Sequence, residues 1–379
     1  GAVQNLQWPP RRICARIRQG AGLEAQVIAT YGRHLRVRDD TGVVHDARPF
    51  GRRLGIVCGD RVRCTRDAAH DEVHAVEVLP RASTLFRSNL RGDAEAIVAN
   101  VTTLAVVVAP RPVPDLFVVD RFLCAAASAG IHALLVINKE DLEGAAELRA
   151  SLGPFEAAGY RALAVAAREA RNIDALAAEL RGQTAVLLGQ SGVGKSSLVA
   201  RLVPDADDVE TGDLVRGEEG RHTTTRSRLY DLPGGGQLID SPGVRDFAPA
   251  IQALEPSSLG FVEIDRLAVD CRFADCRHMA EPGCAVRRAA DDGTLDARRY
   301  ESYRRMRRLF DDLKAAQGPG RRALRSTQRL PPGERVRQRS AIDVLELPSD
   351  RHAVGDARGA HPMAARQLGK EVRGGLALD

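Results

Sequence analysis

The order of a few short motifs constrains this chain more than any other feature of its sequence. Residues 138–141 read Asn-Lys-Glu-Asp, the N-K-x-D pattern with which GTPases bind guanine, and they follow an apolar stretch that ends at Ile137. The sequence Gly-Gln-Ser-Gly-Val-Gly-Lys-Ser at 189–196 comes later, between an apolar stretch and a helix-prone one. That is the context of a phosphate-binding loop. Since conventional GTPases have these two motifs in the opposite order, the chain is predicted to be circularly permuted.

The other motifs complete the rotated order. A threonine-rich segment, Arg-His-Thr-Thr-Thr, occupies 221–225, and Asp-Ser-Pro-Gly occupies 240–243. Val-Ala-Ala at 165–167 stands where the fifth motif usually has Ser-Ala, so it offers only backbone contacts. The order is therefore fourth, fifth, first, second, third, and it predicts a central α/β domain with a parallel sheet that binds GTP or GDP.

The motifs predict the contacts of a GTP molecule with its Mg²⁺. Backbone N–H groups of the glycine loop surround the β-phosphate, Lys195 meets the β- and γ-phosphates, and Ser196 ligates Mg²⁺. The Asp141 carboxylate accepts from the guanine N1 and N2 groups, a donor pair that adenine lacks. The predicted nucleotide-binding residues are Asn138, Lys139, Asp141, Gly189, Gln190, Ser191, Gly192, Val193, Gly194, Lys195, Ser196, Ser197 and Asp240.

Three further residues are predicted to take part in hydrolysis. Thr224 is expected to be a second Mg²⁺ ligand, with its neighbouring threonines as alternatives, and the Gly243 N–H is expected to meet the γ-phosphate. The next residue is Val244, where Ras-like enzymes have the glutamine that orients water. We therefore expect slow intrinsic hydrolysis and an external activator. His222 is the nearest candidate to position water, and an ordinary surface histidine is an equally good interpretation.

Lysine usage supports these assignments. The chain has 4 Lys among 55 basic residues, and Lys139 and Lys195 both lie in the nucleotide motifs. A compact ammonium and a planar guanidinium are not interchangeable against a phosphate. A chance match would not keep lysine at these positions in so arginine-rich a chain.

The segment before the nucleotide motifs predicts a small β-barrel. Short strands expected at 13–17, 24–29, 34–38, 59–64 and 73–78 suit a five-stranded barrel of the oligonucleotide-binding type. Residues 1–91 hold 16 Arg against 9 Asp and Glu, and residues 319–379 are also basic. Two basic ends around an acidic centre favour a polyanion such as RNA as partner, although a purely structural barrel in an arginine-rich protein remains an alternative.

Three cysteines and a histidine predict a metal site. Cys271, Cys276, His278 and Cys284 lie within a short stretch that contains Pro and Gly. Four such ligands suit a closed tetrahedral Zn²⁺ site with a structural role. The other cysteines (Cys14, Cys58, Cys64 and Cys124) stand in apolar or strand-like segments and are expected in hydrophobic cores.

Together these residues resemble one family, the bacterial ribosome small-subunit-dependent GTPase A (RsgA) family. The likeness covers roughly residues 13–315, including the permuted motifs, the Cys/Cys/His/Cys cluster and Arg-Tyr-Glu-Ser-Tyr at 299–303. It implies an oligonucleotide-binding barrel (1–88), a permuted GTPase (89–248) and a helical zinc-binding domain (249–318). It also implies GTP hydrolysis stimulated by the small ribosomal subunit during late maturation, with rRNA binding and release of assembly factors. The segment 319–379 is predicted to be a disordered basic tail.

Two other functions are compatible with the motifs. One is a permuted GTPase that acts on another RNA, and the other is a non-catalytic RNA-binding scaffold that is regulated by nucleotide. An ATPase would leave Asn138 and Asp141 without a task. Because no apolar run is long enough for a membrane span and no signal pattern is evident, we expect a cytoplasmic monomer without a membrane partner.

Overall fold

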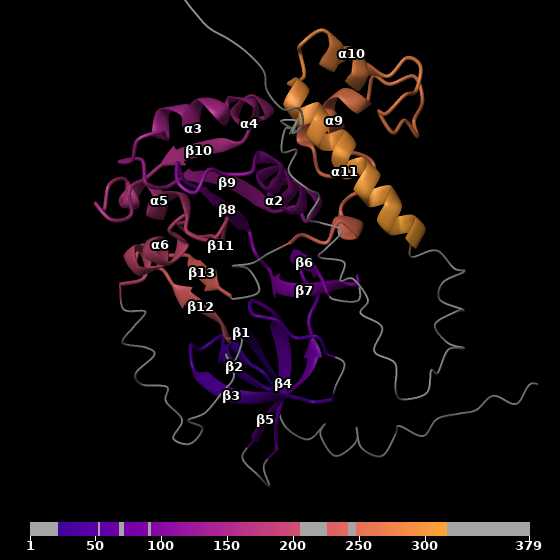
Figure 1. Ribbon diagram of the computed structural model, residues 1–379. Coiled ribbons are helices and arrows are strands. Elements are labelled where there is room, and N and C mark those ends of the chain that lie inside the picture. The colour runs from indigo at the N-terminus through magenta and orange to yellow at the C-terminus, as the bar shows by residue number, and fades with distance from the viewer. Residues whose placement is uncertain are drawn as a thin grey trace, which may run out of the picture. The chain divides into compact units, whose positions relative to one another are not determined.

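The computed structural model describes residues 22–51, 54–67, 72–89, 92–204, 226–241 and 248–316 (Figure 1). The strand predicted at 13–17, Cys14 and the predicted tail at 319–379 lie outside these ranges. So do three residues predicted to act in hydrolysis, His222, Thr224 and Gly243.

A closed five-stranded barrel forms the N-terminal part. The hydrogen-bonded order is β1-β2-β3-β5-β4, and β4 pairs back to β1, which closes the barrel. Alternate residues of each strand face the interior, as expected for strands with one buried side; Val27, Val37 and Val62 are among these core residues. The strands are β1 (Leu23–Tyr31), β2 (His34–Asp39), β3 (Val44–Pro49), β4 (Arg61–Asp67) and β5 (Glu72–Val78).

The expected barrel is confirmed, but its strand list differs from the sequence-based one. The segment Val44–Pro49 forms β3 and was not predicted, since its polar residues and terminal proline weaken the strand pattern. β4 begins at Arg61, after the turn at Gly59, rather than at 59. A Cβ at Gly59 would lie 2.1 Å from the Ala99 carbonyl oxygen, so a close approach of two backbones requires glycine here.

A two-stranded hairpin follows the barrel. β6 (Thr84–Ser88) pairs antiparallel with β7 (Ala94–Ala99). The predicted boundary between residues 88 and 89 therefore falls inside one hydrogen-bonded unit. The domain boundaries predicted from the sequence are taken up again below as a proposal.

The nucleotide-binding part is an α/β sheet. β10, β9, β8, β11 and β13 run parallel in that order, and β12 pairs antiparallel with β13. Every residue of β8 is buried, as expected for a parallel strand covered on both faces. The strands are β8 (Thr103–Val108), β9 (His132–Ile137), β10 (Arg161–Ala164), β11 (Thr184–Leu188), β12 (Arg226–Asp231) and β13 (Gln237–Asp240), and the helices are α2 (Leu116–Ser128), α3 (Ala145–Ser151), α4 (Gly153–Ala158), α5 (Ile173–Glu179) and α6 (Lys195–Leu202).

The barrel and the α/β sheet are joined edge to edge. β1 pairs antiparallel with β12, with Ala29 opposite Arg228, so the hydrogen-bonded ladder continues from one sheet into the barrel. Arg38 of β2 forms an ion pair with Asp231 of β12. This pairing was not predicted from the sequence.

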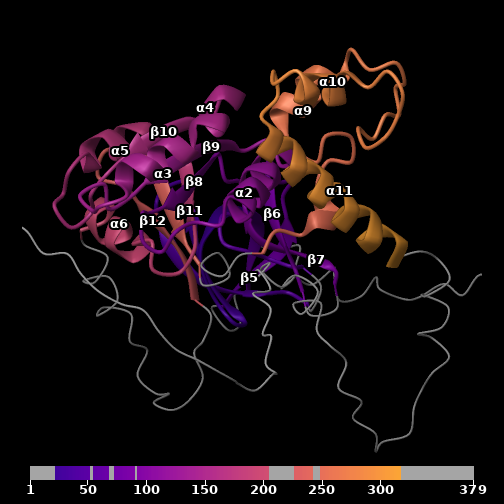
Figure 2. The same cartoon turned by 45° about the horizontal axis from the view of Figure 1, so that its top comes forward.

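The C-terminal part is helical, as predicted. The long helix α11 lies beside α2 of the nucleotide-binding part in two views (Figures 1 and 2). Its elements are the short 3-10 helix η1 (Ile251–Ala253), α9 (Val262–Ala268), α10 (Ala285–Asp291) and α11 (Ala297–Ala316).

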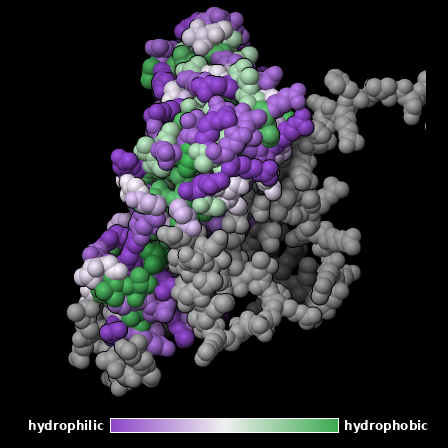
Figure 3. Space-filling model, turned by 90° about the vertical axis from the view of Figure 1, so that its left-hand side faces the viewer, coloured by the Kyte–Doolittle hydropathy of each residue, from purple (hydrophilic) through white to green (hydrophobic). Residues whose placement is uncertain are grey.

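Within the described ranges, no helix is both long enough and apolar enough to span a bilayer. The face drawn in Figure 3 is largely hydrophilic, with smaller hydrophobic areas between the polar residues.

Candidate nucleotide site and metal centre

The strand order brings the predicted nucleotide motifs to one edge of the sheet. The 138–141 motif follows β9, the glycine loop follows β11, and Asp240 is the last residue of β13. These strands belong to one parallel set, so their carboxyl ends share an edge. Open α/β sheets bind their ligands at this edge. The motifs, separated by about a hundred residues in the sequence, therefore meet in one site.

Asn138 joins three of the motif loops. Its side chain is 1% exposed; its Nδ2 donates to the Val193 carbonyl (2.9 Å) in the glycine loop, and its Oδ1 accepts from the Ala167 N–H (3.1 Å) in the fifth-motif loop. A buried amide with both ends bonded fixes the relative position of the loops it connects. Asn138 thus positions the phosphate loop against the guanine motif.

The two predicted lysines, Lys139 and Lys195, each donate to loop carbonyls at this edge of the sheet. Lys195 Nζ donates to Gly189 O (2.6 Å) and Gln190 O (2.9 Å). Lys139 Nζ donates to Gly192 O (2.6 Å) and to Arg111 O (2.8 Å). Lys139 therefore connects the glycine loop with the loop after β8, a segment to which sequence reasoning gave no role. The indication of such a role in the sequence is that this loop directly follows a buried strand.

Most of the remaining predicted residues are exposed or half-buried at the same edge, whereas Gly189 and Val193 are buried. Asp141, Ser191, Ser196 and Ser197 are exposed, Asp240 is half-buried, and Val193 is buried in the core, which anchors the loop. Beyond the loop, Arg201 of α6 donates to Ala167 O (2.9 Å). Helix α6 is thereby tied to the fifth-motif loop as well.

Glycine is required at two loop positions because of close contacts. A Cβ at Gly189 would lie 2.2 Å from Val107 O, and a Cβ at Gly194 would lie 2.3 Å from Asn138 Nδ2. Both residues have a positive φ, 149° and 96° respectively. At Gly192, which also has a positive φ, the nearest atom to such a Cβ is Pro112 Cδ at 3.5 Å.

We expect Gly194→Ala to be markedly more destabilising than Gly192→Ala. Both changes carry the cost of a left-handed backbone, about 1 kcal/mol. Only Gly194→Ala also displaces the Asn138 amide from Val193 O, which adds about 1–3 kcal/mol for a buried polar group left without its partner. Thermal unfolding of the two variants measures the difference, and equal losses of Tm would contradict this account of the loop.

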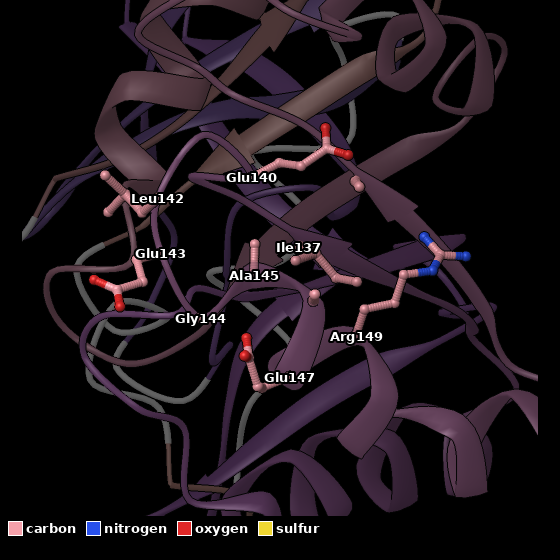
Figure 4. A pocket seen from close by; sticks show the side chains of 10 residues that line it. Ile137, Glu140, Leu142, Glu143, Gly144, Ala145, Glu147 and Arg149 are labelled. Carbon is pink, nitrogen blue, oxygen red and sulfur yellow. The ribbon is translucent and has the colours of Figure 1, made fainter. Parts of the chain in front are cut away.

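A separate hollow of about 500 Å³ lies beside the guanine motif. Figure 4 shows Ile137, Glu140, Glu147 and Arg149 around it. Neither Asp141 nor any residue of the glycine loop lines this hollow. It is therefore distinct from the predicted phosphate site.

The four predicted metal ligands come together. The Cys271 and Cys284 sulfurs are 3.9 Å apart, and each lies 3.5 Å from His278 Nδ1. All four ligand atoms, including that of Cys276, lie within 4.8 Å of one another. A tetrahedral zinc ion with bonds of about 2.3 Å to sulfur and about 2.0 Å to nitrogen implies edges of about 3.8 Å and about 3.5 Å. The cluster therefore fits a metal ion of this size.

The surroundings favour the neutral imidazole of His278 and hold its loop in place. Burial, together with the Arg307 charge, lowers the pKa of His278, which favours the neutral form that binds metals. Burial raises the pKa of the Cys276 thiol to about 12, so a cation is needed to hold it as a thiolate. Tyr300 Oη donates to His278 O (2.7 Å) and Tyr303 Oη to Arg277 O (2.9 Å). Both tyrosines belong to α11, and through these hydrogen bonds they hold the metal loop in place. In the sequence they were part of the family resemblance and were given no role of their own.

The cysteines expected in cores are found there where the structure describes them. Cys58, Cys64 and Cys124 are free and buried. Cys58 and Cys64 lie in or beside the barrel, and Cys124 lies in α2.

Comparison with known proteins agrees with this architecture. The family model described as RsgA GTPase matches residues 78–249. A protein of Chromohalobacter salexigens named small ribosomal subunit biogenesis GTPase RsgA is 41% identical over 286 residues, which cover 74% of this chain and 84% of that protein. The chain belongs to the RsgA GTPase family. A second member of the family, from Azotobacter vinelandii and with the same name, is 44% identical over 252 residues, covering 66% of this chain and 73% of the relative.

Solved structures show the same fold. YjeQ from Thermotoga maritima is 27% identical, with a TM-score of 0.59, covering 76% of this chain and 99% of that chain. YloQ, described as a circularly permuted GTPase, has a TM-score of 0.57 at 23% identity, covering 78% of this chain and 97% of that chain. The predicted permuted fold is thereby confirmed.

Proposed function

We propose that this chain hydrolyses GTP and acts in biogenesis of the small ribosomal subunit, with hydrolysis stimulated by that subunit. The observation that carries the proposal is the junction at Asn138, which joins the phosphate loop to a guanine motif located earlier in the chain. Relatives that share the family are named as GTPases of small ribosomal subunit biogenesis. A barrel segment rich in arginine, with 16 Arg in residues 1–91, suits rRNA as the partner.

We propose the following roles for the residues of the nucleotide motifs. Asn138, Lys139 and Asp141 bind the guanine side, and residues 189–197 hold the phosphates, with Lys195 directed to the β- and γ-phosphates. Mg²⁺ supplies charge neutralisation at these phosphates. Ser196 and Thr224 are its proposed ligands, and Asp240 supports the hydrated ion. The Gly243 N–H and His222 are proposed to meet the γ-phosphate and the attacking water.

The proposal also covers the metal and the organisation of the chain. Zn²⁺ is the ion that three thiolates and one imidazole favour, and we propose one structural zinc per chain in the cluster of Cys271, Cys276, His278 and Cys284. We further propose a barrel at 1–88, a GTPase domain at 89–248 and a zinc-binding domain at 249–318. A cytoplasmic monomer is the proposed working form.

Lys195→Ala is expected to reduce GTP turnover by about 10²–10³-fold, because a charge aimed at the transferred phosphoryl group is lost. The assay is phosphate release from GTP with and without purified small ribosomal subunits. Lys314→Ala is the matched control, because Lys314 is an exposed lysine near the end of α11. It should leave the basal rate unchanged.

The same assay distinguishes the alternatives. Strong stimulation by small subunits, absent from Lys195→Ala, supports the proposal. Tight GTP binding without turnover in any condition would favour a non-catalytic scaffold regulated by nucleotide. Stimulation by large subunits or another RNA alone would favour a permuted GTPase with a different target.

A further inference from the structure

Two arginines, Arg121 and Arg305, stand on the elements that form the seam where α2 lies beside α11. Arg121 belongs to α2, and its Nε and Nη2 atoms are buried without a hydrogen-bond partner. Arg305 belongs to α11, and its guanidinium carbon lies 4.1 Å from the centroid of the Phe117 ring. Phe117 and Arg121 are four residues apart on α2 and share a helix face. Both arginines therefore lie on the seam between the two helices. The helices themselves are seen side by side in Figures 1 and 2.

The neighbouring carboxylates are already engaged. Asp120, on the same helix, is 0% exposed and pairs with Arg298 (3.0 Å) and with Arg299. Asp115 is exposed at the start of α2, where its Oδ1 accepts from Phe117 N (2.9 Å). Arg298 also has two buried guanidinium nitrogens, Nε and Nη2, without a partner. Arg121 and Arg298 thus keep guanidinium nitrogens that neither Asp120 nor Asp115 meets, while Glu263, the second partner of Arg299, has one buried oxygen, Oε2, without a hydrogen bond.

Placing positive charges near one another costs free energy, and so does burying N–H donors without hydrogen-bond partners. A bound anion would offset both costs, because it neutralises the charges and accepts from the donors. Burial, followed by repulsion from Arg305, lowers the pKa of Arg121, and the charge of Asp115 only partly offsets this. Guanidinium groups bind phosphate through parallel N–H donors, often two to one group.

We propose that Arg121 and Arg305 form an anion site for a phosphate group. Its occupant is either a free phosphate or a phosphate of an RNA backbone. The site is separate from the GTP phosphates, and it does not rest on the proposed function. It connects the nucleotide-binding part to the C-terminal helices, since α2 follows the loop whose Arg111 carbonyl accepts from Lys139.

The first test uses inorganic phosphate with the full chain saturated with GDP and Mg²⁺, so that the glycine loop is already filled. Phosphate and chloride are compared at equal ionic strength, because screening alone changes Tm. At about ten times its Kd, phosphate is expected to raise the Tm of the wild type by about 3 °C. Arg121→Gln and Arg305→Gln should lose this shift. Arg308→Gln is the control, since Arg308 lies on α11 as Arg305 does, pairs with Glu301 and is half exposed.

A second variant guards against simple misfolding. Without phosphate, Arg121→Met should have a Tm equal to or above that of the wild type, because it removes an unpartnered buried charge but keeps the side-chain volume. A lower Tm would mean that Arg121 is satisfied as it stands, and would count against the site.

A labelled single-stranded RNA distinguishes the two sources of phosphate. If the backbone is the occupant, RNA affinity should fall about tenfold in Arg121→Gln, but not in Arg308→Gln, and phosphate should compete with RNA. If free phosphate is the occupant, only the Tm shift changes. The proposal is overturned if neither probe distinguishes the wild type from Arg121→Gln.

Discussion

Cys276→Ser is expected to unfold the metal loop and the helices that rest on it, while the barrel and the nucleotide-binding sheet stay folded. The four ligand atoms lie within 4.8 Å of one another and fit a tetrahedral zinc ion. For structural zinc sites, metal binding contributes about 10–16 kcal/mol of apparent free energy to folding. One lost thiolate removes much of it. The two hydrophobic cores of the barrel and the sheet contain none of these ligands.

Metal content and hydrogen exchange measure this result. Bound zinc should fall below one per chain, and backbone amides of 262–316 should lose protection, whereas those of β8 and β11 should keep it. Arg272→Ser is the control, as it changes an exposed residue directly after Cys271. Treating the wild type with a chelator should reproduce the effect. Full protection of 262–316 in metal-free protein would contradict a structural role for the metal.

Asp120→Ala should destabilise the contact between α2 and the C-terminal helices by about 3–5 kcal/mol, because it leaves the buried Arg299 charge without one of its partners. Arg299 is 1% exposed and pairs with Asp120 and with Glu263. Its guanidinium carbon also lies 5.0 Å from the Phe155 ring centroid and 4.7 Å from that of Phe261. Burial disfavours the charge, but the two carboxylates outweigh it and raise the pKa of Arg299.

An exposed ion pair supplies the comparison. Glu24 and Arg63 of the barrel pair at 3.2 Å, with both side chains nearly half exposed, and Glu24→Ala should cost about 1 kcal/mol or less. Thermal unfolding compares the two variants, and hydrogen exchange of α9 and α11 locates the loss. A further variant, Asp120→Leu combined with Arg299→Met, should recover part of the stability, because it removes this pair of charges but leaves Glu263 without Arg299 and Arg298 without Asp120. Equal effects of Asp120→Ala and Glu24→Ala would show that the buried pair contributes no more than a surface pair.

Several elements could be predicted from the sequence for local reasons. β8, β9 and β11 are continuous apolar runs because parallel strands are buried on both faces. The glycine loop is recognisable because a sharp turn between strand and helix needs glycine where a Cβ would strike Val107 O or Asn138 Nδ2. The metal cluster is recognisable because its four ligands are close in the sequence as well as in space. β3 could not be predicted in this way, since Val44–Pro49 contains polar residues and ends at a proline.

What the sequence by itself determined is the set of local structures and the chemistry of each motif, because glycine turns, apolar strands and closely spaced ligands depend on neighbours along the chain. Only the tertiary structure decided that β1 joins β12, that Asn138 connects three loops, and that Asp120 meets Arg299. Strand edges and charged side chains carry no mark of their distant partners. Such groups pair because burying them together costs less free energy than burying either of them alone. That gain arises only when the whole chain has packed.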